Sequence, residues 1–180
     1  MRTPLSRISL LGTSVRYGCK GSFLRQLWSA LCRGFGRETI ARASVTRTDT
    51  GPLIALVNRN DPNHAACVRA TRRLPSGPLI TTWPCFTEAM YLVFRAGGFP
   101  AQSALWLLRT TRRLLLHDLT GTEVDRMVEL METYRDRPMD LADASVIVAA
   151  EHLGMRRLFA LDRDFYIYRL ADGSALEVVP

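Results

Sequence analysis

From residue 44 onward, two kinds of apolar pattern alternate along the chain. Short runs of apolar and β-branched residues predict strands. Longer segments that start at a proline or a capping residue, or end at a glycine, predict helices. The expected strands span residues 44–49, 78–83, 114–119, 156–162 and 174–180, and the expected helices span residues 51–59, 61–74, 84–98, 100–113, 120–136 and 143–153.

This alternation of strands and helices predicts an α/β fold, with a central, mainly parallel sheet covered by helices on both faces. Local signals set several boundaries. We expect Asp61 to cap the helix that follows it, with Pro62 at its first helical position, and Gly154 to end the last helix. In the helix at 120–136, four apolar residues are spaced to share one face: Val124, Met127, Val128 and Met131.

The length and composition of the chain are those of one ordinary globular domain. The chain has 180 residues, of which 47% are hydrophobic and 23% are charged. No uncharged apolar run approaches the roughly 20 residues needed to cross a bilayer, so no membrane association is expected. The four cysteines are scattered and form no C-x-x-C pair, which argues against a zinc site and fits a reducing, cytoplasmic compartment. Three histidines, His64, His117 and His152, share no metal-ligand spacing.

The net charge of +7 comes from the N-terminal segment. Residues 1–45 contain eight basic residues and a single acid, Glu38, whereas basic and acidic residues balance in the remainder. The excess of basic residues therefore lies outside the domain at 45–180, and the net charge does not indicate that this domain binds nucleic acid. Three interpretations of residues 1–44 remain open: a disordered extension, a basic arm that contacts nucleic acid or an acidic partner, and an organellar targeting peptide.

Acidic residues lie where expected strands end or where the following helices begin. Asp49 ends the first strand, Glu88 lies one turn into the helix after the second, and Asp143 lies in the first turn of a strongly apolar helix. Asp162 ends the strand at 156–162, and Asp164 follows two residues later. Because the carboxyl ends of parallel strands share one edge of a sheet, these side chains are expected to meet there.

Carboxylates gathered at one edge would repel one another, and burial would raise their pKa values. A divalent cation removes this cost, and oxygen ligands without His or Cys favour Mg²⁺ or Mn²⁺ over zinc. Each acid also has a structural interpretation. Asp140 can serve as the N-cap of its helix, and the others as turn residues or exposed helix acids.

Four segments in order resemble those of the PIN-domain ribonucleases, above all the VapC-type toxins of bacterial toxin–antitoxin modules. They are TDTGPLIALVNRNDPNHAACVRATRRL, TTWPCFTEAMYLV, MDLADASVIVAAEHLG and LDRDFYIYR. The resemblance covers about residues 45–180 and leaves out residues 1–44. It implies a three-layer α/β/α sandwich.

The resemblance also implies a Mg²⁺- or Mn²⁺-dependent endoribonuclease that cleaves single-stranded or loop RNA. It further implies a small antitoxin partner and a homodimer. The metal-binding and catalytic acids it implies are Asp49, Glu88, Asp143 and Asp162, with Asp140, Asp164 and Thr50 as auxiliary residues. The chain departs from the family pattern at Arg47, where an apolar residue is usual, and at Ala160, where Thr or Ser often precedes the last acid. The alternative is a PIN-like module that binds RNA or protein without cleaving.

Overall fold

The computed structural model describes residues 45–137 and 139–179, so the three interpretations of residues 1–44 lie outside the described residues. The strands are β1 (Thr46–Thr48), β2 (Leu79–Thr82), β3 (Leu114–His117), β4 (Arg157–Phe159) and β5 (Glu177–Val179). The α-helices are α2 (Thr50–Val57), α3 (His64–Thr71), α4 (Trp83–Thr110), α5 (Gly121–Thr133) and α6 (Leu141–Leu153), and η2 (Asp164–Tyr166) is a 3₁₀ turn.

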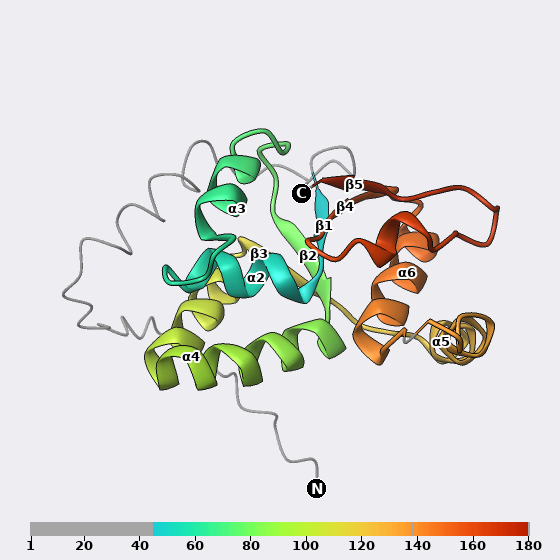
Figure 1. Ribbon diagram of the computed structural model, residues 1–180, viewed down its shortest axis with the longest axis horizontal. Coiled ribbons are helices and arrows are strands. Elements are labelled where there is room, and N and C mark those ends of the chain that lie inside the picture. The colour runs from blue at the N-terminus through green and yellow to red at the C-terminus, as the bar shows by residue number, and fades with distance from the viewer. Residues whose placement is uncertain (1–44, 138, 180) are drawn as a thin grey trace, which may run out of the picture. The chain divides into compact units, whose positions relative to one another are not determined.

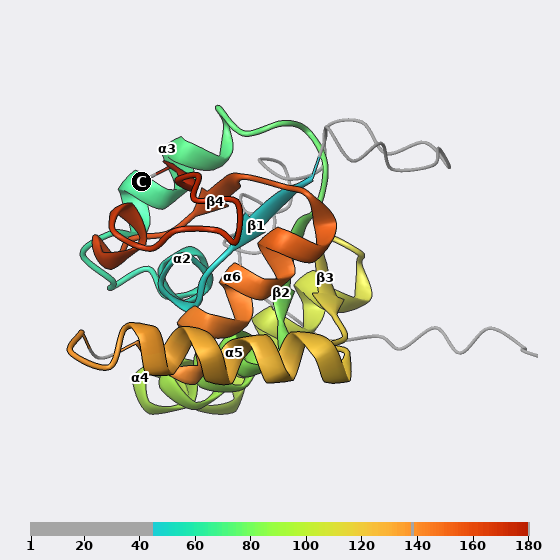
Figure 2. The same ribbon diagram turned by 90° about the vertical axis from the view of Figure 1, so that its right-hand side faces the viewer.

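The described strands form one sheet in the order β3-β2-β1-β4-β5, in which every neighbouring pair is parallel. Figure 1 shows α2, α3 and α4 on one side of this sheet and α5 and α6 on the other. Figure 2 shows α6 in front of the sheet, where it packs against β1 and β2, with α5 against α6. The predicted three-layer α/β/α sandwich is therefore confirmed.

Helix α6 is the most deeply buried helix in the described part of the chain. Every residue from Ala144 to Ala150 is buried, and Ile147 is fully enclosed between the sheet and the surrounding helices. The Asp140 side chain accepts a hydrogen bond from the Asp143 N–H at the N-terminus, and Gly154 ends the helix in the left-handed conformation. Burial on all sides explains why its sequence is almost uniformly apolar.

The prediction that Asp61 caps the second helix is wrong. Helix α3 begins at His64, and its N-cap residue is Asn63. The Asp61 carboxylate instead accepts a hydrogen bond from the Asn63 N–H, 2.8 Å away, and closes a turn before the helix. Asp next to Pro is favourable in both settings, so the local sequence did not separate them.

The two helices expected at 84–98 and 100–113 form the single element α4, which is interrupted at Gly98. Gly98 has φ 62° and ψ −159°, a backbone conformation outside the helical region that residues other than glycine rarely adopt. Pro100 follows two residues later and cannot donate a hydrogen bond to the preceding turn. The expected break is confirmed as a kink between two helical segments.

The apolar face expected for α5 is only partly correct. Met127 is buried, but 46% of Val124 and 63% of Val128 are exposed. The helix instead buries Glu123, Met127 and Leu130. Glu123 is held by the reciprocal hydrogen bonds of a capping box with Thr120, which satisfies its carboxylate and allows the helix to turn this residue inward.

The two departures from the family pattern leave the sheet intact. Arg47 lies in β1 with 2% of its surface exposed, and the strand pairs on both sides despite this charge. Ala160 is buried, and its N–H donates to the Val179 carbonyl. Within the described residues, no helix has the length and apolar character needed to pass through a membrane.

Candidate active site

The four acids expected at the site come from different elements but lie on the same side of the sheet. Asp49 follows β1 and occupies the N-cap position of α2. Glu88 lies in the second turn of α4, and Asp143 in the first turn of α6. Asp162 follows β4, the strand next to β1. In a parallel sheet these positions share the carboxyl edge of the strands, as expected from the sequence.

Asp49 is the most buried of the four acids expected at the site, with 7% of its surface exposed. Burial, with a smaller contribution from the negative charges of Glu88 and Asp140, raises the pKa of its carboxyl group to about 6. The backbone N–H groups of Thr50 and Gly51 at the start of α2 oppose this increase. Desolvation therefore outweighs the stabilisation that the helix terminus gives to the anion.

Asp143 is half-buried, and its carboxyl group has the most perturbed pKa of the set. Burial is the largest cause, and the charges of Asp140, Asp49 and Asp162 add to it, so that the pKa reaches about 8. Together with the effect of Glu88 on Asp49, these interactions place each of the five acids close enough to influence at least one other. The structure therefore brings together Asp49, Glu88, Asp140, Asp143 and Asp162.

Two of these acids also have structural roles. Asp140 caps α6 through one oxygen, as its structural interpretation predicted. The Asp162 Oδ1 atom accepts a hydrogen bond from the Asp164 N–H at 2.9 Å, at the start of η2. Each carboxylate has a second oxygen beyond the one used in this bond. The charge of Asp164 acts on the buried Tyr168, as the charges of Asp140, Asp143 and Asp162 do.

A buried polar cluster lies directly beneath Asp49 and joins three elements. The Cys85 thiol of α4 lies 3.8 Å from Asp49 Oδ1 and 3.5 Å from the Ala142 carbonyl of α6. The Thr50 hydroxyl donates to the Cys85 carbonyl at 3.3 Å. Thr50 therefore links α2 to α4, and within residues 45–137 and 139–179 its hydroxyl makes no hydrogen bond to an acid.

On the neighbouring side of this cluster, the hydroxyl groups of Thr82 and Ser145 are hydrogen-bonded to each other. The Ser145 hydroxyl is also within 2.7 Å of the Ala142 carbonyl, one turn before it. Thr82 is the last residue of β2, so this pair fixes α6 to the sheet at the end of the strand. The first turn of α6, which carries Asp143, is thereby held in place from below.

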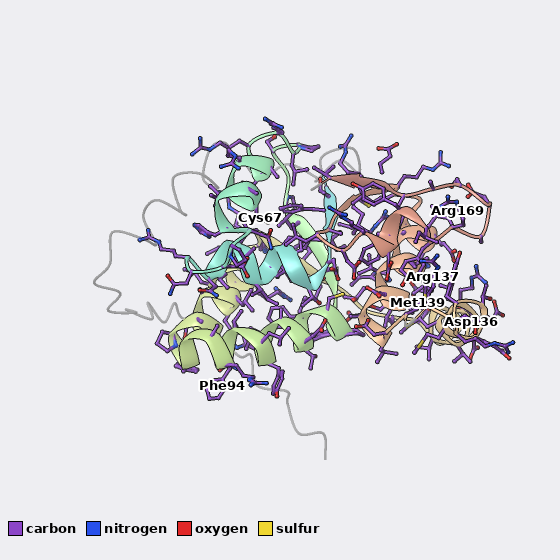
Figure 3. All side chains as sticks on the ribbon, viewed as in Figure 1. Cys67, Phe94, Asp136, Arg137, Met139 and Arg169 are labelled. Carbon is purple, nitrogen blue, oxygen red and sulfur yellow. The ribbon has the colours of Figure 1, made fainter. Side chains whose placement is uncertain are left out.

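Tyr168 lies close to the acids on the C-terminal side of the site. It is fully buried, and its ring packs edge-on against Tyr134 and Phe165. Burial and the charges of Asp143, Asp164, Asp162 and Asp140 raise the pKa of its hydroxyl group. Its loop is held by Arg169, whose guanidinium donates to the carbonyls of Tyr166, Ile167 and Tyr168, and Figure 3 labels Arg169 on this loop.

The acids are near one another but are not closed into a ligand cage. In residues 45–137 and 139–179, no group of three His, Cys, Asp or Glu side chains is arranged as a preformed metal site. The chemistry of the donors nevertheless suits a hard divalent cation, since every candidate is a carboxylate. The raised pKa values of Asp49 and Asp143 reflect first the burial of these groups and then the repulsion from neighbouring acids, and a cation would relieve both costs.

Sequence reasoning missed Cys85, Ser145 and Tyr168. Ser145 is the one polar residue in a buried apolar run of α6, and that contrast was an available signal. A single cysteine and a single tyrosine carry no spacing that indicates a site. The sequence also gave no sign that His117 and His152 come within 5.5 Å of each other, measured between ring centroids, beside Glu123.

Comparison with known proteins agrees with the resemblance seen in the motifs. No family model matches the chain. The chain is 26% identical to ribonuclease VapC26 of Mycobacterium tuberculosis over 136 residues, which cover 73% of this chain and 98% of that protein.

Two solved structures share the fold. One is Mycobacterium tuberculosis VapC20, a toxin described as cleaving the sarcin-ricin loop, with a TM-score of 0.65, 22% identity and coverage of 76% of this chain and 100% of that one. The other is VapBC2 of Rickettsia felis bound to a DNA fragment from its promoter, with a TM-score of 0.52, 14% identity and coverage of 74% and 98%. The predicted similarity to VapC-type proteins is therefore confirmed.

Proposed function

We propose that this chain is the toxin of a toxin–antitoxin module, an endoribonuclease of the VapC type that hydrolyses phosphodiester bonds in single-stranded or loop RNA. The observation that carries the proposal is the meeting of five carboxylates at one edge of the sheet: one from α4, two from α6 and its N-cap, and one after each of β1 and β4. The similarity to a curated VapC ribonuclease over most of both chains supports the same conclusion.

The residues that would hold Mg²⁺ or Mn²⁺ are Asp49, Glu88, Asp143 and Asp162. A bound divalent cation supplies positive charge to the scissile phosphate and acidifies a water molecule at neutral pH. The oxygen-only donor set and the raised pKa of Asp143 support such a cation, because the folded protein otherwise concentrates uncompensated negative charge at this edge.

The chain's own groups divide the remaining tasks. Asp143 has a pKa of about 8 without a cation, so it retains its proton at neutral pH and becomes a carboxylate when positive charge arrives. Asp140 and Asp162 each use one oxygen in a backbone hydrogen bond, which fixes the direction of the other. Cys85 and Thr50 hold Asp49 and the start of α2 against α4, and act as positioning residues.

The partner proteins are part of the same proposal. Figure 3 shows Phe94 on α4, and this helix exposes several large aromatic residues: Trp83, Tyr91, Phe94, Phe99 and Trp106. Exposed aromatic residues on one element are typical of protein interfaces. We assign this surface to a second copy of the chain or to the antitoxin, and place the protein in the cytoplasm, where the free thiols of Cys67 and Cys85 are stable.

The decisive experiment is an RNA cleavage assay with purified protein, in the presence of Mg²⁺ and with EDTA. We expect cleavage with Mg²⁺, no cleavage with EDTA, and none by Asp143→Asn, while the control Asp125→Asn, an exposed acid of α5, should cleave normally. Mg²⁺ should also raise the melting temperature of the wild type by mass action but not that of Asp143→Asn.

Cleavage that continues in EDTA, or at an unchanged rate in Asp143→Asn, would exclude the proposed mechanism. RNA binding without cleavage, together with a melting temperature that ignores Mg²⁺, would favour the alternative of a PIN-like module that only binds.

A further inference from the structure

A short loop leads away from the acids at the carboxyl edge of the sheet. It begins at Asp162, one of the acids proposed to hold the cation, and continues through η2 to Arg169. Its buried residue Tyr168 lies within reach of the charge of Asp143, in the first turn of α6. The exposed side chains of this loop therefore border the proposed site of cleavage.

The end of α5 packs against this loop. The rings of Tyr134 and Tyr168 meet edge-on with their centroids 5.0 Å apart, and the Tyr134 hydroxyl accepts a hydrogen bond from the Arg169 N–H at 3.1 Å. Figure 3 labels Arg169 on the loop and Arg137 just beyond α5. Side chains from both segments thus form one surface beside the acids. We call it the η2 surface, and its members are Arg137, Arg163 and Tyr166.

The two arginines of the η2 surface make no ion pair with the acids beside them in the sequence. Arg163 lies between Asp162 and Asp164. Arg137 follows Asp136, and both arginines are exposed. Within residues 45–137 and 139–179, neither guanidinium makes a hydrogen bond or an ion pair. Because a guanidinium binds two oxygens of one phosphate, these groups can contact an RNA backbone without first breaking another interaction.

Tyr166 presents its ring from a fixed turn, with 53% of its surface exposed. The Asp162 carboxylate closes the start of η2 by accepting a hydrogen bond from the Asp164 N–H. The Arg169 guanidinium donates to three successive carbonyls, beginning with that of Tyr166 at 2.8 Å. A single exposed aromatic residue is ordinary on a protein surface. Beside two unpaired arginines and on a fixed backbone, however, its ring is suited to stack on a nucleobase at a low cost in entropy.

We propose that the η2 surface binds the single-stranded segment of the RNA substrate next to the scissile phosphate, with the Tyr166 ring stacked on a base and the Arg137 and Arg163 guanidinium groups on backbone phosphates. The inference rests on the proposed nuclease function and adds the direction in which the strand leaves the acids, across η2 and the end of α5. RNA fits this surface better than an acidic protein segment does, because carboxylates would use the two cations and leave the ring without a partner.

The test is the binding of a fluorescently labelled single-stranded RNA of about ten nucleotides, measured by fluorescence anisotropy. The full chain carries Asp143→Asn, and Mg²⁺ is present, so that the RNA stays intact. Arg137→Gln and Arg163→Gln, combined in this background, should weaken the dependence of log Kd on log salt concentration by about 1.4, since each phosphate contact on a single strand contributes about 0.7. The matched control, Arg69→Gln with Arg72→Gln, removes two exposed arginines at α3 and should leave this dependence unchanged.

The ring is tested in the same background. Tyr166→Ala should weaken binding about tenfold without changing the salt dependence, because stacking involves no phosphate charge. Tyr166→Phe keeps the ring and should bind as the parent does, and so should the control Tyr91→Ala, which removes an exposed ring from α4. Residues 1–44 are present in every variant, so any contribution from them cancels in these comparisons.

The proposal is overturned if the control arginines alter the salt dependence as much as Arg137 and Arg163 do, or if Tyr166→Ala binds RNA as tightly as its parent. If the wild type cleaves RNA but binding is insensitive to all three residues, the η2 surface does not hold the substrate and the nuclease function still stands. A wild-type chain that neither binds nor cleaves RNA refutes both.

Discussion

Replacing Asp49 with asparagine should stabilise the protein at neutral and alkaline pH. The pKa of this carboxyl group rises from its ordinary value of 3.8 to about 6 in the folded chain. Since one pKa unit corresponds to about 1.4 kcal/mol, the ionised form costs the folded state about 3 kcal/mol. Asparagine has nearly the same shape and keeps an oxygen for the N–H groups of Thr50 and Gly51, but carries no charge.

The direction of the pH dependence follows from the raised pKa. Between pH 3.8 and 6 the folded protein binds a proton at Asp49 that the unfolded chain has already released. The free energy of unfolding is therefore fully retained below pH 3.8, falls as the pH rises through this window, and reaches its lower value above pH 6. Because the pKa of Asp143 is about 8, the free energy of unfolding of the wild type continues to fall up to about that pH.

Urea denaturation at a series of pH values between 4 and 9, with EDTA present to remove divalent cations, measures this effect. The free energy of unfolding of Asp49→Asn should exceed that of the wild type by up to about 3 kcal/mol above pH 6 and should converge with it near pH 4. The free energy of unfolding of the variant should also change less steeply with pH up to pH 8, because the pKa of Asp143 falls when the charge of Asp49 is removed.

The matched control is Asp125→Asn, which removes one exposed carboxylate from α5 and should leave the pH profile unchanged. If Asp49→Asn is no more stable than the wild type at pH 8, or if both profiles have the same slope, then burial of Asp49 does not carry the cost assigned to it. The electrostatic reasoning about the whole acidic cluster would then fail.

Three further predictions concern the scaffold. Gly154→Ala should lower the free energy of unfolding by about 1 kcal/mol in urea titrations, because alanine is strained at φ 61°, and an equal loss in the exposed Gly121→Ala would contradict this. Thr120→Ala should lower the free energy of unfolding by about 1 kcal/mol, because it removes the capping box of α5. Thr120→Ser keeps the hydroxyl and should retain most of that stability. Cys67 and Cys85 should resist alkylation at pH 8 until the protein is unfolded, since burial raises their thiol pKa values to about 11 and about 12, and peptide mass spectrometry would detect early labelling.

The layers of the fold were predictable because each element carries its own periodic signal. Five strands and the helices between them follow from local sequence, and parallel pairing follows from their alternation. The order of the strands did not follow, because an apolar pattern shows that a strand is buried without showing which strand lies beside it. The rotation of α5 was misjudged for a related reason: the sequence pattern favoured Val124 and Val128, but the capping box turned Glu123 inward.

The candidate site was predictable to the extent that topology determines it. Asp49 and Asp162 follow adjacent strands, so their approach needed no knowledge of side-chain packing. The contact of the Cys85 thiol with Asp49, and the position of Tyr168 within reach of the charge of Asp143, depend on packing between distant segments. Isolated residues of this kind have no partner at fixed spacing, and only the packed structure reveals them.

The position of β4 between β1 and β5 has a consequence for the order of events during synthesis. The central strand is translated first but gains its second neighbour only when residues 157–159 have emerged, and Asp162 follows immediately. A nascent chain that stops earlier has an open sheet edge and an incomplete set of acids. Any activity of this edge must therefore wait until residues 157–162 have joined the rest of the sheet.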